Sequence, residues 1–132
     1  MARVLVVDDD ADASEALVRV LRHRGHDATW VGNGRTAMAL LIADTPDFAV
    51  FDFKMPGMTG LELLKAARSY LRLQDLPALI VTAYPEAPEL RDIQELDVVG
   101  VLGKVNLDLP HIADLVDEHA GPGKPPIRQQ KN

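Results

Sequence analysis

Five residues whose side chains can take part in phosphoryl chemistry each stand at the end of a short apolar run. Asp8 and Asp9 follow the first run, and Asp52 closes another. Thr82 and Lys104 follow two later runs. Three carboxylates held together repel one another and raise each other's pKa unless a cation lies between them. Mg²⁺ meets this need because it prefers oxygen ligands. With the ion bound, Asp52 can stay ionised and attack phosphorus, while the ammonium group of Lys104 neutralises charge.

The apolar runs themselves predict the strands of a sheet. Each run is nearly continuous rather than alternating, which is typical of strands covered on both faces. The four strong runs and one weaker run are Val4–Val7, Phe48–Phe51, Ala78–Val81, Val98–Leu102 and Ala28–Val31. Helical patterns separate these runs. The alternation predicts an α/β fold with a doubly wound, five-stranded parallel sheet of order 2-1-3-4-5, in which ligands bind beyond the carboxyl ends of the strands.

Apolar spacing and capping residues indicate where the helices lie. The expected inner faces are Ala16, Leu17, Val20 and Leu21; Ala37, Leu40 and Leu41; Leu61, Leu64, Ala67 and Leu71; Leu90, Ile93 and Leu96 in a short fourth helix from Pro88; and Ile112, Leu115 and Val116. Asp12 with Glu15, and Thr59 with Glu62, predict capping boxes for the first and third helices. Asp108 is the predicted cap of the fifth helix.

The composition is typical of one globular domain. The chain has 132 residues, of which 47% are hydrophobic and 26% charged, enough to bury a core. It has no cysteine, which excludes a disulfide framework, a thiolate metal site and a cysteine nucleophile. No apolar run is long enough to span a membrane, and the opening residues do not form a signal peptide, so we expect a cytoplasmic location.

The charge is unevenly distributed along the chain. The whole chain carries −6, but its last twelve residues hold three basic and no acidic side chains, which leaves 11 basic and 20 acidic residues, or −9, in residues 1–120. A domain this acidic repels a phosphate backbone, so we expect no direct binding to nucleic acid. We predict a domain over residues 1–120 and a flexible linker or C-terminal tail over residues 121–132, which are rich in glycine and proline.

At these positions the chain resembles the response regulator receiver domains of two-component signalling, from about Arg3 to His119. The motifs that carry the resemblance are Val7-Asp8-Asp9, Asp52-Phe53-Lys54-Met55-Pro56-Gly57-Met58, Val81-Thr82-Ala83 and Gly103-Lys104. Together, in this order and spacing, they are highly specific. The resemblance implies the CheY-like variant of the flavodoxin-like three-layer sandwich. It also implies a phosphoacceptor that is not an enzyme in its own right but assists its own phosphorylation and dephosphorylation.

The resemblance further implies a role for each site residue. Asp52 is the expected phosphorylation site. Mg²⁺ is the expected cofactor, and Asp52 is among its expected ligands. Asp9 is expected to be a direct ligand, with Asp8 acting through water and Lys54 contributing its backbone carbonyl. Thr82 is expected to bond to the phosphoryl oxygen and to report its arrival, while Lys104 pairs with the site.

Partners follow from the same resemblance. The expected phosphoryl donor is a phosphohistidine on a sensor histidine kinase or a histidine phosphotransfer protein. The signal is expected to pass to an output domain or downstream protein through the face made by the fourth helix, fifth strand and fifth helix. A phosphorylation-linked homodimer is a further partner state to test.

Three positions depart from the family pattern. Val101 stands where a tyrosine or phenylalanine is common, so the usual inward rotation of a ring cannot occur there. Val105 follows Lys104 in place of the usual proline with a cis bond. We predict a trans peptide, because a cis bond without proline costs about 2.5–4 kcal/mol. Thr59 stands where an aspartate is common and should still cap its helix.

Several side chains have less specific interpretations. Lys54 and Tyr84 flank the site at positions that tune the lifetime of the phosphoryl group in the family, and our hypothesis is that they shield the acyl phosphate from water. Trp30 is interpreted as a packing residue. The four histidines, His23, His26, His111 and His119, show no metal-ligand spacing and are interpreted as surface residues.

Two other functions remain open from the sequence. The first is a receiver-like interaction module that signals without phosphorylation; Val101 and Val105 favour it, whereas the complete acidic set and Lys104 weigh against it. The second is a small phosphatase or other hydrolase, which the sequence disfavours because no second acid or histidine is placed to activate water. Magnesium titration distinguishes the phosphoacceptor and the module from an inert scaffold, and phosphomonoester turnover tests the hydrolase.

Overall fold

The sheet has the predicted order. The computed structural model describes residues 1–120, so the tail expected at residues 121–132 lies outside the described residues. Five parallel strands pair in the order β2-β1-β3-β4-β5. Their bounds are β1 Arg3–Val7, β2 Asp27–Val31, β3 Phe48–Asp52, β4 Ala78–Thr82 and β5 Gly100–Gly103. The last strand therefore begins two residues later than expected, and the others lie within one residue of their predicted bounds.

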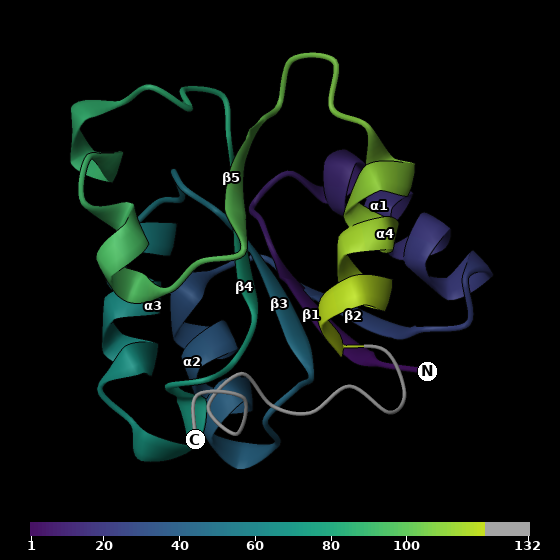
Figure 1. Cartoon of the computed structure of the whole chain (residues 1–132), viewed down its shortest axis with the longest axis horizontal. Coiled ribbons are helices and arrows are strands. Elements are labelled where there is room, and N and C mark those ends of the chain that lie inside the picture. The colour runs from purple at the N-terminus through teal and green to yellow at the C-terminus, as the bar shows by residue number, and fades with distance from the viewer. Residues whose placement is uncertain (121–132) are drawn as a thin grey trace.

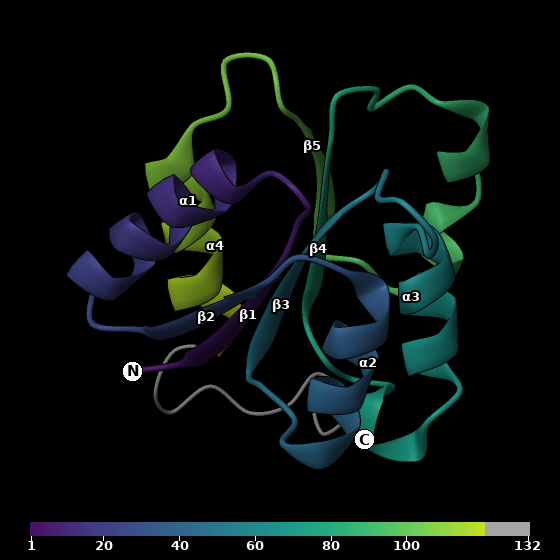
Figure 2. The ribbon, with the colours of Figure 1, turned by 180° about the vertical axis from the view of Figure 1, so that it is seen from behind.

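Helices cover both faces of this sheet (Figures 1 and 2). The α-helices are α1 Ala11–His23, α2 Gly34–Ala43, α3 Gly60–Arg68 and α4 Leu109–Ala120, and the 3₁₀ turns are η1 Leu71–Leu73, η2 Pro88–Leu90 and η3 Ile93–Leu96. The pair α1 and α4 packs on one face, and the pair α2 and α3 packs on the other (Figure 1). The fold is the α/β three-layer sandwich that the alternating pattern predicts.

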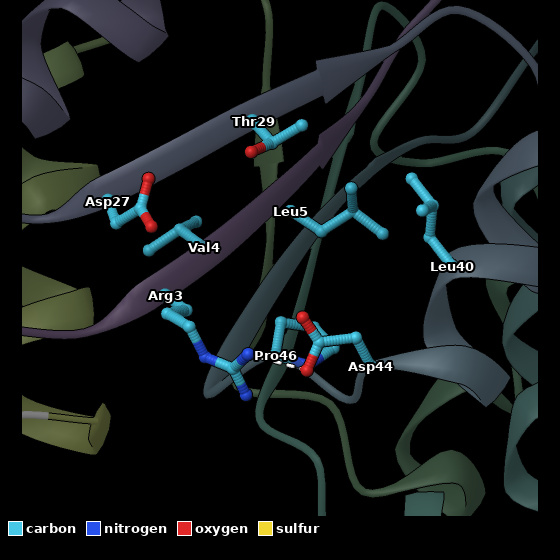
Figure 3. Close-up of a pocket in the computed structure, with 8 residues that line it drawn as sticks. All are labelled: Arg3, Val4, Leu5, Asp27, Thr29, Leu40, Asp44 and Pro46. Atoms are coloured by element: carbon cyan, nitrogen blue, oxygen red, sulfur yellow. Dashed lines mark hydrogen bonds and ion pairs between the residues drawn. The ribbon is translucent and has the colours of Figure 1, made fainter.

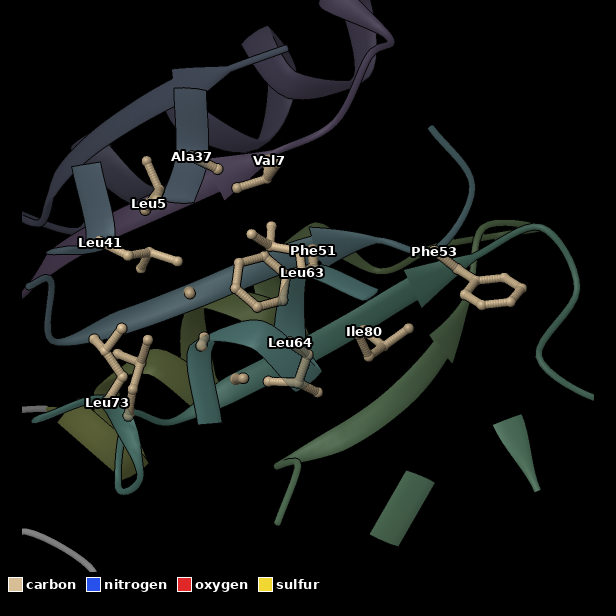
Figure 4. Packing of buried hydrophobic residues seen from close by; sticks show 14 of the residues in the cluster. Leu5, Val7, Ala37, Leu41, Phe51, Phe53, Leu63, Leu64, Leu73 and Ile80 are labelled. Atoms are coloured by element: carbon tan, nitrogen blue, oxygen red, sulfur yellow. The ribbon is translucent and has the colours of Figure 1, made fainter. Parts of the chain in front are cut away.

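Two apolar cores lie between the layers because successive strand residues point to opposite faces. On β1, Leu5 and Val7 belong to the core under α2 and α3, whereas Val4 and Val6 belong to the core under α1 and α4. Phe51 and Leu63 fill the first core (Figure 4). Burial on both faces explains why the strands read as continuous apolar runs.

The capping residue of α1 differs from the prediction. Asp10, not Asp12, is the N-cap, and its carboxylate accepts hydrogen bonds from the backbone N–H groups of Asp12 and Ala13. Glu15, expected to close a capping box, instead pairs with Arg19 at 2.9 Å. The prediction was wrong because Asp10 is the last residue with extended backbone, so the helix begins at Ala11, two residues earlier than a cap at Asp12 implies.

The cap of α3 agrees with the prediction, but its inner face does not in full. Thr59 and Glu62 form the reciprocal capping box. Leu64 and Ala67 are buried as expected, and Leu63 joins them. Leu71 is 77% exposed, because α3 ends at Arg68 and Leu71 belongs to the following 3₁₀ turn.

The short fourth helix is replaced by the two 3₁₀ turns η2 and η3. Its apolar residues Leu90, Ile93 and Leu96 recur every three residues, which matches the three-residue turn of a 3₁₀-helix better than the 3.6-residue turn of an α-helix. Asp97 then takes a left-handed backbone conformation and ends η3. The guanidinium of Arg68 on α3 joins the end of η3 to η1, since it donates hydrogen bonds to the carbonyls of Leu96 and Leu73.

The last helix has its predicted cap. It also contacts a histidine that was predicted to lie on the surface but is buried. Asp108 accepts a hydrogen bond from the backbone N–H of His111 at 3.1 Å, as expected of the cap of α4. His26, interpreted as a surface residue, is buried. Its Nδ1 accepts the backbone N–H of Ala2, and its Nε2 lies 2.6 Å from the carboxylate of Asp117 on α4. A single side chain therefore connects the start of β1 to the last helix.

Ser14 provides a stability prediction. Within residues 1–120, its buried hydroxyl has no hydrogen-bond partner, and an unpaired buried hydroxyl costs free energy. We expect Ser14→Ala to raise the free energy of unfolding by about 1 kcal/mol, helped by the higher helix propensity of alanine. Urea unfolding measures this change. Ser69→Ala is the control, because the exposed Ser69 hydroxyl donates to the Ala66 carbonyl; an unchanged or lower stability of Ser14→Ala would contradict the prediction.

Candidate functional site

The predicted site residues meet at the carboxyl edge of the sheet. Asp52 and Thr82 are the last residues of β3 and β4, and Asp8 follows β1 directly. Each of Asp8, Asp9 and Asp52 offers a carboxylate oxygen within 4.8 Å of the other two. Asp8 and Asp52 are buried, whereas Asp9 is exposed. Parallel strands bring their carboxyl ends to one edge, which is why residues distant in sequence lie side by side here.

Lys104 is the positive partner of the two buried carboxylates. Its Nζ lies 3.2 Å from Asp8 Oδ2 and 3.3 Å from Asp52 Oδ1. Burial lowers the pKa of Lys104, but attraction to Asp52 and Asp8 outweighs it, so the net change is upward. Lys104 therefore stays protonated at neutral pH and supplies a fixed positive charge.

Asp52 is in an environment that disfavours its charge. Burial, followed by repulsion from Asp8, raises the pKa of Asp52 to about 6, although Lys104 acts in the opposite direction. One ammonium group does not compensate fully for two carboxylates and their loss of water. The site is therefore short of positive charge when only protein atoms are counted.

A groove of about 330 Å³ opens above these residues, lined in part by Asp9, Lys54, Thr82 and Tyr84. The ammonium group of Lys54 lies 5.3 Å from the centre of the Tyr84 ring, within the range of a cation–π contact. The Thr82 hydroxyl accepts the backbone N–H of Tyr84 at 3.0 Å. Asp52 lines the same groove, which makes the groove the candidate binding space beside its carboxylate.

Local backbone contacts hold the loops of the site in place. Gly60, the first residue of α3, donates its N–H to the Phe53 carbonyl at 2.8 Å. Lys104 donates its N–H to the Thr82 carbonyl at 2.8 Å. The loop after β1 is held by Asp8, whose carboxylate accepts the backbone N–H of Asp10 at 2.9 Å. These contacts hold the backbone from which the functional side chains extend.

Three residues of this site were not found from the sequence. Asp10 caps α1, Trp30 donates its indole N–H to the Asp8 carbonyl at 2.6 Å, and Gly60 packs against the Asp52 backbone. Glycine at the first position of a helix is a poor helix former, and this was a usable signal for close backbone approach. No local signal in the sequence indicates that Trp30 makes this hydrogen bond, so its role goes beyond the packing role that was predicted for it.

Two departures from the family pattern have structural outcomes. No cis peptide bond occurs among residues 1–120, so the bond between Lys104 and Val105 is trans as predicted. Val101 is half-buried and packs against the core under α2 and α3. A small branched side chain therefore occupies the position where a ring is common.

A second pocket lies away from these residues, at the amino end of β1 (Figure 3). It has a volume of about 130 Å³ and includes Arg3, Asp27 and Asp44. The guanidinium of Arg3 already pairs with Asp44 at 2.6 Å and donates to the Thr45 carbonyl. Its charge is satisfied within the protein, so this pocket offers no free cation to a ligand.

Comparisons with known proteins agree with the geometry. The family model of the response regulator receiver domain matches residues 4–117. The chain belongs to this family. The receiver domain is 36% identical over 103 residues to the chemotaxis protein CheY of Pseudomonas aeruginosa, covering 77% of this chain and 83% of that protein. It is 29% identical over 117 residues to the sporulation initiation phosphotransferase F of Bacillus subtilis, covering 89% and 92% of the two chains.

A solved structure shows the same fold. The crystal structure of a response regulator receiver protein from Pseudomonas putida superposes with a TM-score of 0.80 at 32% identity, covering 88% of this chain and 95% of that chain. The receiver domain is thus a phosphoacceptor of two-component signalling with the CheY-like fold. No helix among residues 1–120 is long and apolar enough to cross a membrane.

Proposed function

We propose that Asp52 is the residue that accepts the phosphoryl group. The observation that carries this proposal is the position of its buried carboxylate, 3.3 Å from the ammonium of Lys104, at the floor of a groove on the carboxyl edge of the sheet. Asp8 also pairs with Lys104 but does not line this groove, whereas Asp9 lines the groove but forms no ion pair with Lys104 within residues 1–120. Asp52 is therefore the carboxylate best placed to be both reached by a phosphoryl donor and neutralised by a fixed cation.

The transfer step exchanges one bond to phosphorus for another. A carboxylate oxygen of Asp52 forms the new bond as the bond between phosphorus and the histidine nitrogen of the donor breaks. The electron pair of the broken bond stays on that nitrogen, which then takes up a proton from water. Lys104 stabilises the negative charge on the phosphoryl oxygens, and Thr82, which lines the groove, is placed to bond to one of them.

The donor set of the site fits Mg²⁺. The three carboxylates offer oxygen ligands within 4.8 Å of one another, and Mg²⁺ binds carboxylates while keeping several waters. Asp9 and Asp52 would hold the ion directly, Asp8 through water, and Lys54 through its backbone carbonyl. The bound ion supplies the positive charge that Lys104 alone does not, which keeps Asp52 ionised and balances the phosphoryl oxygens.

The partners are proposed on the basis of family membership. The donor is a sensor histidine kinase or a histidine phosphotransfer protein, and the cytoplasm is the proposed location. The output face comprises η2, η3, β5 and α4. The turns η2 and η3 stand where the fourth helix was predicted, β5 is the fifth strand, and α4 corresponds to the predicted fifth helix. Output passes through this face to an attached domain, a downstream protein, or a second phosphorylated copy of the chain. The receiver domain itself assists the gain and loss of its phosphoryl group without acting on another substrate.

The experiment is intact-mass measurement after incubation with acetyl phosphate, with Mg²⁺ or with EDTA. We expect a single phosphoryl adduct that requires Mg²⁺ and is absent from Asp52→Asn. Asp47→Asn, an exposed aspartate at the other end of β3, is the matched control and should still form the adduct. An adduct that persists in Asp52→Asn would place the phosphoacceptor elsewhere. No adduct from acetyl phosphate or from phosphorylated kinases would return the question to the phosphorylation-independent module.

The contact between Lys54 and Tyr84 leads to a prediction about phosphoryl lifetime. Lys54 lies over the Tyr84 ring at the edge of the groove, and our hypothesis is that the two side chains limit the approach of water to Asp52. We expect Lys54→Asn and Tyr84→Ala each to speed hydrolysis of the acyl phosphate by about two- to ten-fold, the effect of roughly one weak cation–π contact. Loss of the adduct with time, followed by mass, measures the rate. If both variants keep the native rate, the shielding hypothesis fails.

A further inference from the structure

The backbone of Asp8 is held on both sides by β2. Its N–H donates to the Val31 carbonyl at 3.2 Å, which continues the ladder between β1 and β2 by one residue. Its carbonyl accepts the indole N–H of Trp30 at 2.6 Å. The second bond comes from a side chain, and it lies one residue beyond the end of β1 at Val7.

This carbonyl belongs to the peptide unit that joins Asp8 to Asp9. Because a peptide unit is planar, fixing its oxygen also fixes the direction of the Asp9 N–H and the position of the Asp9 Cα. Asp9 lies in the three-residue loop between β1 and α1, and it is exposed. On its far side, Asp10 is anchored as the N-cap of α1. Trp30 therefore anchors the peptide unit that precedes Asp9, the one exposed member of the acidic cluster of Asp8, Asp9 and Asp52.

The position of the indole indicates more than core packing. Trp30 is 40% exposed, and its ring lies over Gly32, where a Cβ would sit 3.5 Å from the ring. A large aromatic ring that is still well exposed gains less from burial than a core residue does. What distinguishes this ring is its short hydrogen bond to the loop that carries Asp8 and Asp9.

We propose that Trp30 is a positioning residue for the divalent-cation site, acting through the Asp8 carbonyl to hold the Asp9 carboxylate close to Asp8 and Asp52. The inference rests on the proposed function, since it requires that these carboxylates bind a divalent cation. Loss of the indole N–H lets the Asp8–Asp9 peptide rotate, so ordering Asp9 becomes part of the cost of binding the ion. Cation affinity falls while the fold is retained.

The test measures Mn²⁺ binding to Trp30→Phe by electron paramagnetic resonance, with Mg²⁺ as competitor. We expect the dissociation constant to rise about three- to ten-fold, the effect of one hydrogen bond. Tyr70→Leu is the matched control, because Tyr70 is 43% exposed and follows the end of α3, outside the acidic cluster; it should bind Mn²⁺ as the native protein does. Urea unfolding in EDTA shows whether each variant is folded.

A second variant separates the N–H group from the ring. Benzothienylalanine at position 30 keeps the shape of the indole but has sulfur in place of N–H. We expect it to weaken Mn²⁺ binding as Trp30→Phe does. Native affinity in either variant would overturn the proposal. If the native protein itself binds neither Mn²⁺ nor Mg²⁺, the proposed function fails instead, so the two failures are distinguishable.

Fluorescence gives an independent readout in the unmodified protein. Trp30 is the single tryptophan of the chain, so all indole emission reports on this contact. We expect Mg²⁺ to change the emission with the same midpoint as the binding curve, and Asp9→Asn to remove that change. Emission that does not respond to a Mg²⁺ concentration that saturates the site would contradict coupling between Trp30 and the cation.

Discussion

An Asp52→Asn variant is expected to resist unfolding better than the native receiver domain at pH 7 in EDTA, although it accepts no phosphoryl group. The reason is the environment of the Asp52 carboxylate. Burial and the neighbouring Asp8 raise its pKa to about 6 despite the attraction of Lys104. A raised pKa means that the folded protein favours the neutral acid, which asparagine resembles in size and charge.

The direction of the pH dependence follows from the same shift. The folded protein binds the Asp52 proton more tightly than the unfolded chain, whose aspartate has its ordinary pKa of about 3.9. This contribution to stability is fully present below pH 4 and is lost as the pH rises to about 6. A difference of about two pKa units corresponds to roughly 2–3 kcal/mol as an upper limit. Asparagine has no proton to lose, so the advantage of the variant should appear only above about pH 4.

Urea unfolding at pH 4 and pH 7 measures this effect. We expect Asp52→Asn to match the native protein at pH 4 and to exceed it at pH 7 in EDTA. Adding Mg²⁺ at pH 7 should stabilise the native protein and reduce the difference, because the ion binds the folded state. Asp92→Asn, an exposed aspartate without a side-chain capping bond, is the control and should change little. A less stable Asp52→Asn at pH 7 would mean that attraction to Lys104 outweighs burial and repulsion.

Gly60→Ala is expected to have the largest effect on folding. A Cβ at this position would overlap the backbone carbonyl oxygen of Asp52 and lie 2.9 Å from its carbon. Neither atom belongs to a flexible side chain, so either α3 or the end of β3 must move. Overpacking of this kind costs about 3 kcal/mol or more when the neighbour is backbone. Because the displaced residue is the proposed phosphoacceptor, phosphoryl acceptance should fall together with stability.

Gly57→Ala is the matched control for this substitution. Gly57 lies in the same loop and has a φ of +86°, but a Cβ there would meet no atom within 4 Å. Its cost is backbone strain alone, about 1 kcal/mol. Urea unfolding and acetyl phosphate labelling of both variants measure the difference. Equal losses in the two variants would show that backbone conformation, not the contact with Asp52, limits this loop.

Local sequence determined the strands, the starts of α3 and α4, and the edge of the sheet where the site residues gather. Continuous apolar runs reflect burial on two faces, and this feature of β1, β3 and β4 requires no knowledge of distant contacts. The Thr59–Glu62 capping box is equally local, since its partners are three residues apart. Asp52 and Lys104 were predicted to meet because parallel strands bring their carboxyl ends to one edge whatever the details of packing.

Only the tertiary structure decided the contacts between segments that are distant in the sequence. Trp30 meets Asp8 across 22 residues, and His26 meets Asp117 across 91 residues. Such contacts depend on the twist of the sheet and on how far each loop extends, and a local pattern contains neither quantity. The same limit applies to the place where η3 docks, since its last residue, Leu96, accepts a hydrogen bond from Arg68 of α3, 28 residues away. Sequence thus determined which side chains gather at the carboxyl edge, whereas packing between distant segments decided how they are held there.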